Sequence, residues 1–337
     1  MRRTAEHGRS TDGAPGSGRA GTEQPAKPPG SGKLGVLFGG KGLPYLLILP
    51  AVVFELFVHV IPMIAGVTVS FFELTQFYVR NWASAPFAGL NNFRSGLDIG
   101  GPIGGALLQS FAVTALYTVV VIGLSWLLGI SAALLLNGEL RGRSLFRTLF
   151  LIPYALPVYV SVLAWQFMLQ QQTGSVNALL VDNLGVLSER PFWLIGENAF
   201  WGLVLTSVWR LWPFAFLMLL AGLQTIPREL HEAAATDGAS KWRQFRTITL
   251  PLLKPVNLVL LLVLFLWTFN EFNTPFVLFG PAPPEWANLI SLHIYVNSFV
   301  NWNFGLGAAM SVVLLLLLLV VSVVYIRLFR VGSEGDA

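Results

Sequence analysis

The sequence contains no cysteine, and only 11% of its 337 residues are charged. Without cysteine, disulfide frameworks, thiolate metal sites and cysteine nucleophiles are excluded. Soluble domains carry about 25% charged residues, so the shortage of charge, together with a hydrophobic fraction of 54%, indicates a polytopic membrane protein. The net charge is +4. The basic residues lie between apolar runs rather than on a basic helix with interleaved aromatics, so we expect no nucleic-acid partner.

Two fragments of catalytic motifs are incomplete. Gly30–Lys33 resembles the end of a phosphate-binding loop, but the full pattern GxxxxGK(S/T) would need glycine and serine or threonine where Lys27 and Leu34 stand. We therefore expect the chain to have no ATP site of its own. His231 begins a stretch like the zinc-protease motif HExxH, but Ala235 occupies the position of the second histidine. We expect neither a metal site nor a cofactor.

Six apolar stretches are long enough to cross a bilayer. A hydrocarbon core of about 30 Å needs about 20 mostly apolar residues in a helix, because each backbone N–H and C=O must find its partner within the segment. The sequence therefore predicts an all-α protein with six transmembrane helices, in which prolines interrupt apolar runs without ending them. The predicted spans are Leu46–Val69, Phe111–Leu136, Leu149–Leu169, Phe200–Leu223, Val256–Phe279 and Gly305–Tyr325.

The positions of lysine and arginine predict the orientation of these spans. With a cytoplasmic N-terminus, only Arg80, Arg94 and Arg190 would lie in external loops. Cytoplasmic loops carry an excess of Lys and Arg, so we expect both termini in the cytoplasm. The predicted domains are a disordered cytoplasmic tail rich in Gly, Pro and Ser, the first span with an external segment, a transmembrane core and a short cytoplasmic tail, at residues 1–42, 43–106, 107–328 and 329–337.

The cytoplasmic loop at residues 226–255, IPRELHEAAATDGASKWRQFRTITLPLLKP, predicts two short helices joined by a turn. Pro227 suits the first position of a helix, where its missing N–H is not needed. Asp237-Gly238 is a helix stop, because glycine adopts the left-handed conformation that ends a helix. The second helix should run from Ser240 to about Thr249, closed by the two prolines that follow.

Small side chains dominate the turn between these helices. Ala233, Ala234 and Ala239 would allow a bulky side chain of another protein to come close, and charged neighbours would form a polar rim. An alternative is an amphipathic helix at the membrane interface with its arginines on lipid phosphates.

The loop resembles a known motif. Its residues Glu232-Ala233-Ala234, Asp237-Gly238-Ala239, Phe245, Ile248, Leu250-Pro251 and Pro255 are similar to the EAA loop of ABC importer permeases, EAAxxDGAxxxxxFxxIxLPxxxP. The resemblance implies a type-1 ABC importer permease fold and a loop that docks into a separate ATPase. It assigns ATPase coupling to Glu232, Ala233, Ala234, Asp237, Gly238 and Ala239.

Other stretches resemble the sugar-importer branch, in particular the first permease of the pair in maltose and glycerol-3-phosphate type systems. They are FAGLNNF at Phe87–Phe93, LFLIPYALP at Leu149–Pro157 and WNFGLGAAMS at Trp302–Ser311. The chain departs from this branch at Val277–Asn288, VLFGPAPPEWAN, where sugar permeases usually show TxGGP.

The resemblance also implies partners and a location. The partners are a second permease subunit, a dimer of cytoplasmic ABC ATPases, an extracytoplasmic substrate-binding protein, the lipid bilayer and a small polar solute such as a carbohydrate. The location is the bacterial cytoplasmic membrane.

Ionisable residues inside the predicted spans need a reason, because each costs roughly 2.5–3.5 kcal/mol on insertion scales. Glu55 and His59 lie four residues apart, on one helix face. They predict either a substrate or proton contact or a satisfied pair packed between helices. Arg210 predicts a role in helix packing or a gate.

The fifth span contains the polar stretch WTFNEFNTPF. Planar polar groups bind sugar hydroxyls and aromatic faces bind sugar C–H surfaces, so we assign the substrate path to Trp267, Asn270, Glu271 and Asn273. The alternative is hydrogen bonding between helices.

Alternatives for the whole chain are an ABC permease for a non-sugar solute, an ion-coupled secondary transporter using Glu55, His59 and Glu271, and an integral-membrane transferase or hydrolase. Inverted repeats, expected of many secondary transporters, are not evident. The outer loops lack the clustered polar residues that the membrane enzyme would need.

Overall fold

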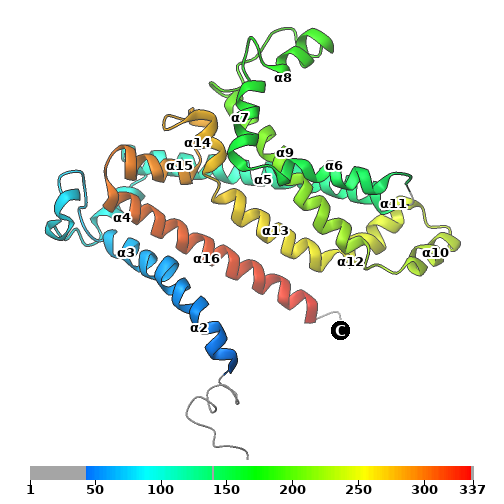
Figure 1. Cartoon of the computed structure of the whole chain (residues 1–337), viewed down its shortest axis with the longest axis horizontal. Helices are drawn as coiled ribbons and strands as arrows, with labels where there is room; N and C mark the ends of the chain where they lie inside the picture. Colours follow the sequence, from blue (N-terminus) through cyan, green and yellow to red (C-terminus); the bar gives the residue numbers. More distant parts are fainter. Residues whose placement is uncertain (1–42, 139, 335–337) are drawn as a thin grey trace, which may run out of the picture. The chain divides into compact units, whose positions relative to one another are not determined.

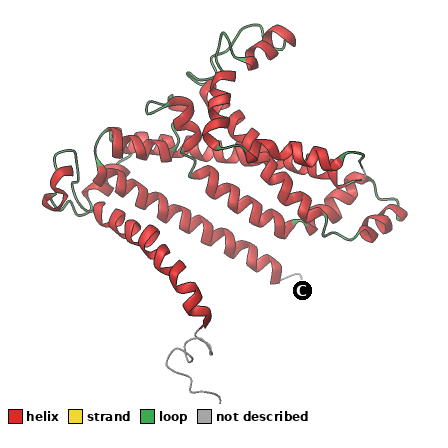
Figure 2. Cartoon of the chain, viewed as in Figure 1, coloured by secondary structure: helices red, strands yellow, loops and turns green. Residues whose placement is uncertain are grey.

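The structure is a computed structural model that describes residues 43–138 and 140–334; the predicted disordered tail at residues 1–42 lies outside the described residues. Within the described part the regular elements are helical, with two isolated bridges and no strand (Figure 2). The α-helices are α2 (Leu43–Glu55), α3 (Ile61–Val69), α4 (Asn91–Leu97), α5 (Pro102–Asn137), α6 (Arg143–Ala155), α7 (Val158–Met168), α8 (Ser175–Asn177), α9 (Asn198–Leu223), α10 (Arg228–Thr236), α11 (Lys241–Gln244), α12 (Leu250–Leu252), α13 (Lys254–Phe269), α14 (Asn273–Phe279), α15 (Ile290–Tyr295) and α16 (Phe304–Glu334). Short π-helical turns are η1 (Leu56–Val60), η3 (Ala178–Asn183), η4 (Phe245–Thr249) and η6 (Val296–Val300), and 3₁₀ turns are η2 (Val79–Ser84) and η5 (Glu285–Ala287).

Five of the six predicted spans appear among the described residues as helical stretches long and apolar enough to cross a membrane. They are Pro44–Val69, Pro102–Asn137, Asn198–Leu223, Lys254–Phe279 and Phe304–Leu328. The sixth, predicted at Leu149–Leu169, is a pair of helices, α6 and α7, bent by 90°.

The bend between α6 and α7 corrects one prediction. Pro153 lies inside α6, as expected of a proline that interrupts an apolar run without ending it. Pro157, however, does end the helix. Leu156 before it is extended, with φ −72° and ψ 142°, because the ring of a following proline disfavours the α region.

Contacts divide the chain into two units, Met1–Pro62 and Met63–Ala337. In the first, α2 continues into the π-helical turn η1, none of whose residues is buried. The Nδ1 atom of His59 lies 3.2 Å from a carboxylate oxygen of Glu55, so the two side chains pair, but both are mostly exposed rather than packed between helices.

In the second unit, α5 and α9 pack along each other and form the core (Figure 1). Polar side chains within the spans find partners across helices. The Tyr117 hydroxyl on α5 donates to the Ser207 hydroxyl on α9 at 2.8 Å, and the Trp126 indole donates to the Asn257 amide oxygen on α13 at 2.7 Å.

Two of the three motifs that resemble sugar permeases meet in one contact. The Asn92 side-chain amide donates to the carbonyl oxygens of Ser70 and Phe72, each at 2.9 Å. The backbone N–H of Gly305 donates to the Leu74 carbonyl at 3.1 Å, and a Cβ on Gly305 would lie only 2.1 Å from the Phe72 carbonyl oxygen. Asn92 of FAGLNNF and Gly305 of WNFGLGAAMS therefore both contact the same turn at residues 70–74.

Replacing Gly305 with alanine should destabilise the protein, because its methyl group would overlap the Phe72 carbonyl oxygen. We expect a loss of about 1–3 kcal/mol, typical of overpacking, measured as a lower thermal unfolding midpoint in detergent. Gly123→Ala is the matched control, since nothing lies within 4 Å of a Cβ there. Equal midpoints for the two variants would contradict the tight contact.

Candidate functional site

Helix α10, the first helix of the loop at residues 226–255, ends at a left-handed glycine. Gly238 has φ +79°. The Ala239 N–H donates to the Ala234 carbonyl at 2.9 Å, and the Gly238 N–H to the Ala235 carbonyl at 3.0 Å. This pair of bonds is a Schellman motif, which satisfies carbonyls left without partners at a helix end. The predicted stop at Asp237-Gly238 is confirmed.

The second helix of the loop is longer than predicted. Ser240 caps it by accepting a hydrogen bond from the Arg243 N–H at 3.3 Å. From α11 the chain continues through η4 into α12, so the prediction that Pro251 closes the helix is wrong. Pro251 lies in α12, directly after the π-helical turn η4. The helix is interrupted instead at Leu253, between α12 and α13.

The predicted coupling residues lie together at this elbow, which we define as α10 and the turn to α11. These six residues differ in how exposed their side chains are. Glu232, Ala233, Asp237 and Gly238 are exposed, whereas Ala234 and Ala239 are half-buried. The first four can therefore contact another protein directly, and the other two hold the turn.

The fifth span is broken in the middle. Helix α13 ends at Phe269 and α14 begins at Asn273. The Glu271 carboxylate accepts a hydrogen bond from the Thr274 N–H at 2.9 Å and thereby caps the start of α14. Broken spans are tolerated in a membrane only where the freed backbone groups are satisfied again.

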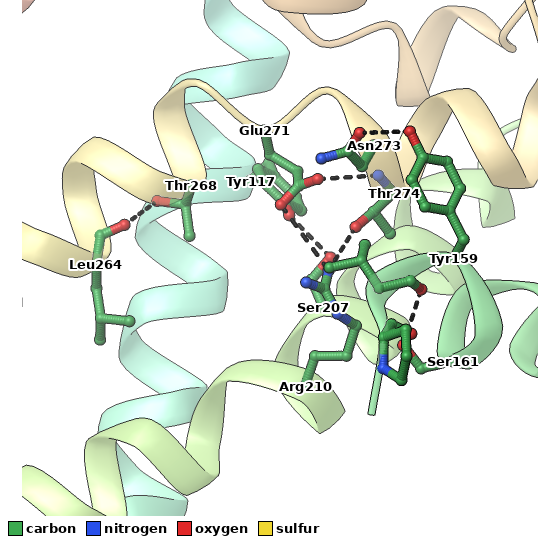
Figure 3. Close-up of polar contacts among 12 residues, drawn as sticks. Tyr117, Tyr159, Ser161, Ser207, Arg210, Leu264, Thr268, Glu271, Asn273 and Thr274 are labelled. Atoms are coloured by element: carbon green, nitrogen blue, oxygen red, sulfur yellow. Dashed lines mark hydrogen bonds and ion pairs between the residues drawn. The ribbon is translucent and has the colours of Figure 1, made fainter. Parts of the chain in front are cut away.

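Arg210 on α9 neutralises this cap (Figure 3). Its guanidinium donates to the Thr274 hydroxyl at 2.8 Å and lies 3.9 Å from the second carboxylate oxygen of Glu271. Both charged side chains are 13% exposed. Arg210 therefore ties α9 to the break, in agreement with its predicted packing role, and Glu271 is turned toward α14.

The other predicted path residues are more open. Trp267 is 43% exposed and Asn270 is exposed, its amide donating to the Leu266 carbonyl at 3.2 Å. Asn273 is half-buried and accepts a hydrogen bond from the Tyr159 hydroxyl of α7 at 3.1 Å (Figure 3).

A row of aromatic rings beside the break was not found from the sequence. The Phe214 ring centroid lies 4.8 Å from that of Trp267 and 5.7 Å from that of Tyr154, on which it stacks. Tyr154 and Tyr159 are 44% and 53% exposed. These residues come from α6, α7 and α9, so no spacing along the chain could reveal that they gather near α13.

No metal centre accompanies these sites: the described residues 43–138 and 140–334 contain no group of three or more His, Asp or Glu side chains placed to hold an ion.

A family model described as the binding-protein-dependent transport system inner membrane component matches residues 125–330, which include both the elbow and the broken span. The chain belongs to this family.

Similar proteins agree with this membership. The trehalose/maltose transport system permease of Thermococcus litoralis is 34% identical over 290 residues, which cover 86% of this chain and 94% of that protein. The sulfoquinovosyl glycerol transport system permease of Agrobacterium fabrum is 34% identical over 293 residues, covering 87% and 92%. A chain of the bacterial alginate ABC transporter, solved in complex with an alginate pentasaccharide-bound periplasmic protein, superposes with a TM-score of 0.70 at 22% identity, over 86% of this chain and 94% of that one. The last likeness shows the fold.

Replacing Arg210 with methionine should leave the Glu271 charge without its partner. Removal of one member of a buried pair costs about 3–5 kcal/mol, so we expect a marked fall in the thermal unfolding midpoint in detergent. The double variant Arg210→Met/Glu271→Gln should lose less than the sum of the single variants, because glutamine keeps an acceptor for the Thr274 N–H. Additive losses would mean that the two side chains are not coupled.

Replacing Gly238 with alanine should strain the elbow by about 1–2 kcal/mol, the cost of a left-handed conformation for a residue with a Cβ. Gly185→Ala is a matched control, since Gly185 also has positive φ, at +60°, and neither position has an atom within 4 Å of a Cβ. Both variants should unfold at similar temperatures. ATP-dependent uptake should fall only in Gly238→Ala. Equal uptake by the two variants would show that the shape of the elbow does not affect transport.

Proposed function

We propose that this chain is the transmembrane permease subunit of an ATP-driven importer of carbohydrates, driven by a separate ATPase through its elbow. The observation that supports coupling most directly is the exposed edge of the elbow, Glu232, Ala233, Asp237 and Gly238, held in shape by the Schellman motif. Two small residues beside two acidic ones leave space for a partner's side chains and a polar rim around them.

A rigid connection leads from the elbow to the spans. Leu253, at the join of α12 and α13, is fully buried. A Cβ on Gly222, near the end of α9, would lie 2.7 Å from the Leu253 side chain, so the two helices meet closely here. A push on the elbow would move α9 and α13 together, as a rigid-body change about helix interfaces.

Helix α9 also contacts the fifth span at its break. There Arg210 of α9 contacts Glu271, between α13 and α14, and Thr274, in the first turn of α14. Motion transmitted along α9 and α13 would therefore arrive at the residues assigned to the substrate path. Glu271 serves there as the cap that fixes the break, and Trp267, Asn270 and Asn273 are the side chains available to a passing solute.

The solute class follows from chemistry and from the relatives. Exposed rings of Tyr154, Tyr159 and Trp267 beside the amides of Asn270 and Asn273 match the C–H faces and hydroxyl groups of a sugar. The similar proteins are named for trehalose or maltose, for sulfoquinovosyl glycerol and for alginate. Hydroxyl-rich saccharides are common to these, so we extend that class to this chain.

The proposed assembly contains a second permease, two ATPase subunits and an external substrate-binding protein, with both termini of this chain in the cytoplasm. The segment between α7 and α9 suits the docking of the binding protein. Arg190 lies 2.6 Å from the Asp182 carboxylate, and the buried Asn177 accepts a hydrogen bond from the Trp193 indole at 2.7 Å. These contacts give the segment a defined surface.

The residues that an ion-coupled secondary transporter would use are already engaged. Glu271 contacts the Thr274 N–H and Arg210, and Glu55 pairs with His59.

The coupling assignment is tested with Ala233→Leu. Ala233 is exposed, so the variant should fold normally, while its larger side chain should block the partner's approach. We expect the ATPase to be lost on co-purification of the complex and uptake to fall at least ten-fold. Ala221→Leu, at another exposed alanine on the last turn of α9, is the control and should retain both. Normal co-purification of Ala233→Leu would refute the docking surface.

The solute assignment is tested by uptake in cells carrying the intact importer, with a panel of labelled disaccharides, amino acids and peptides. Trp267→Ala should reduce uptake of the transported saccharide at least ten-fold while leaving membrane insertion unchanged. Uptake of an amino acid or peptide instead of any saccharide would contradict the proposed class.

A further inference from the structure

A pocket lies where the elbow faces the ends of α5 and α9. We propose that the pocket between α10, α11 and the cytoplasmic ends of α5 and α9 binds a phosphate group, supplied by the headgroup of an anionic lipid. This assignment goes beyond the proposed function and depends neither on the solute nor on the ATPase.

The pocket has a volume of about 560 Å³ and brings together four separate parts of the chain. It is lined by Leu134, Asn137, Gly138, Leu223, Arg228, His231, Lys241, Gln244, Phe245 and Thr249. A volume of this size accommodates a phosphodiester headgroup together with its nearest glycerol atoms.

Positive charge converges on this pocket. Arg228 and His231 lie three residues apart on α10, hence on one face of that helix, and Lys241 begins α11. Among the described residues that line the pocket, none is Asp or Glu. A guanidinium and an ammonium directed to one concave surface, with an imidazole beside them, favour a phosphate over a neutral guest.

The remaining walls indicate a lipid rather than a free anion. Leu134 belongs to the span Pro102–Asn137 and is 42% exposed, and Leu223 and Phe245 extend the apolar wall on α9 and η4. The amide of Asn137 and the buried Thr249 lie among the polar lining. A cavity that is basic at the end of a span and apolar beside it matches an anionic lipid of the cytoplasmic leaflet.

The pocket lining and the residues assigned to ATPase coupling are different residues of the elbow. His231, half-buried, lines the pocket, whereas Ala233, two residues later and on nearly the opposite side of α10, is exposed. A lipid in the pocket would therefore leave Ala233 open to a protein partner.

The test is native mass spectrometry of the full-length chain purified in nonionic detergent, titrated with phosphatidylglycerol. We expect one retained phosphatidylglycerol per chain, and no comparable binding of phosphatidylcholine with the same acyl chains. Lys241→Gln should raise the apparent Kd for phosphatidylglycerol about five-fold, as expected from the loss of one basic group near an anionic surface.

Arg243→Gln is the matched control, because it removes an equal charge from an exposed position of the same helix but outside the pocket lining. It should leave the Kd unchanged. Equal weakening by both variants, or equal binding of phosphatidylcholine, would overturn the site.

Glycerol 3-phosphate added as competitor distinguishes a lipid headgroup from a soluble phosphate as the source of the phosphate group. Failure to displace the lipid supports the proposal. Displacement at similar affinity would overturn the lipid as the ligand in favour of a soluble phosphate.

Discussion

The structure depends on one constraint: in hydrocarbon, each backbone N–H and C=O must have a partner within the protein. Helices meet it without help, and most of the residues that the structure describes lie in helices. The fifth span meets it differently, because helix α13 ends at Phe269 and helix α14 begins only at Asn273. Glu271 supplies the missing acceptor to the Thr274 N–H, and Arg210 balances the charge that this introduces.

The Arg210–Glu271 contact is also part of a wider connection between α9 and the fifth span. Arg210 belongs to α9, whose C-terminal end meets the start of α13 at the close contact between Gly222 and Leu253. Helix α13 is entered directly from the elbow through η4 and α12. Helix α9 is thus joined to the fifth span at two places, by a contact without space for a Cβ at Gly222 and by the Arg210–Glu271 ion pair at the break. In the proposed function, a displacement of the elbow would be carried along these two packed helices.

Much of this could be predicted from the sequence, and the failures have physical causes. Apolar runs of 20 or more residues specify spans by length alone, and Gly238 specifies the end of α10 because few other residues adopt its φ. Pro157 was misjudged, since Pro153 and Pro213 sit inside helices and Pro157 does not; the difference is the conformation of Leu156. The assignment of Glu271 to the substrate path stays a prediction, and its engagement with Arg210, 61 residues earlier in the chain, leaves no trace in spacing.

The sequence by itself determined that the chain is a helical membrane protein with a small-residue elbow, because hydropathy, charge placement and turn chemistry act over short distances along the chain. Tertiary structure alone decided which polar residues of the fifth span are turned inward and which stay open, that Asn92 and Gly305 fasten one turn, and that Arg228, His231 and Lys241 line one pocket. These outcomes depend on how helices far apart in sequence pack, and packing is set by the shapes of all the neighbours together.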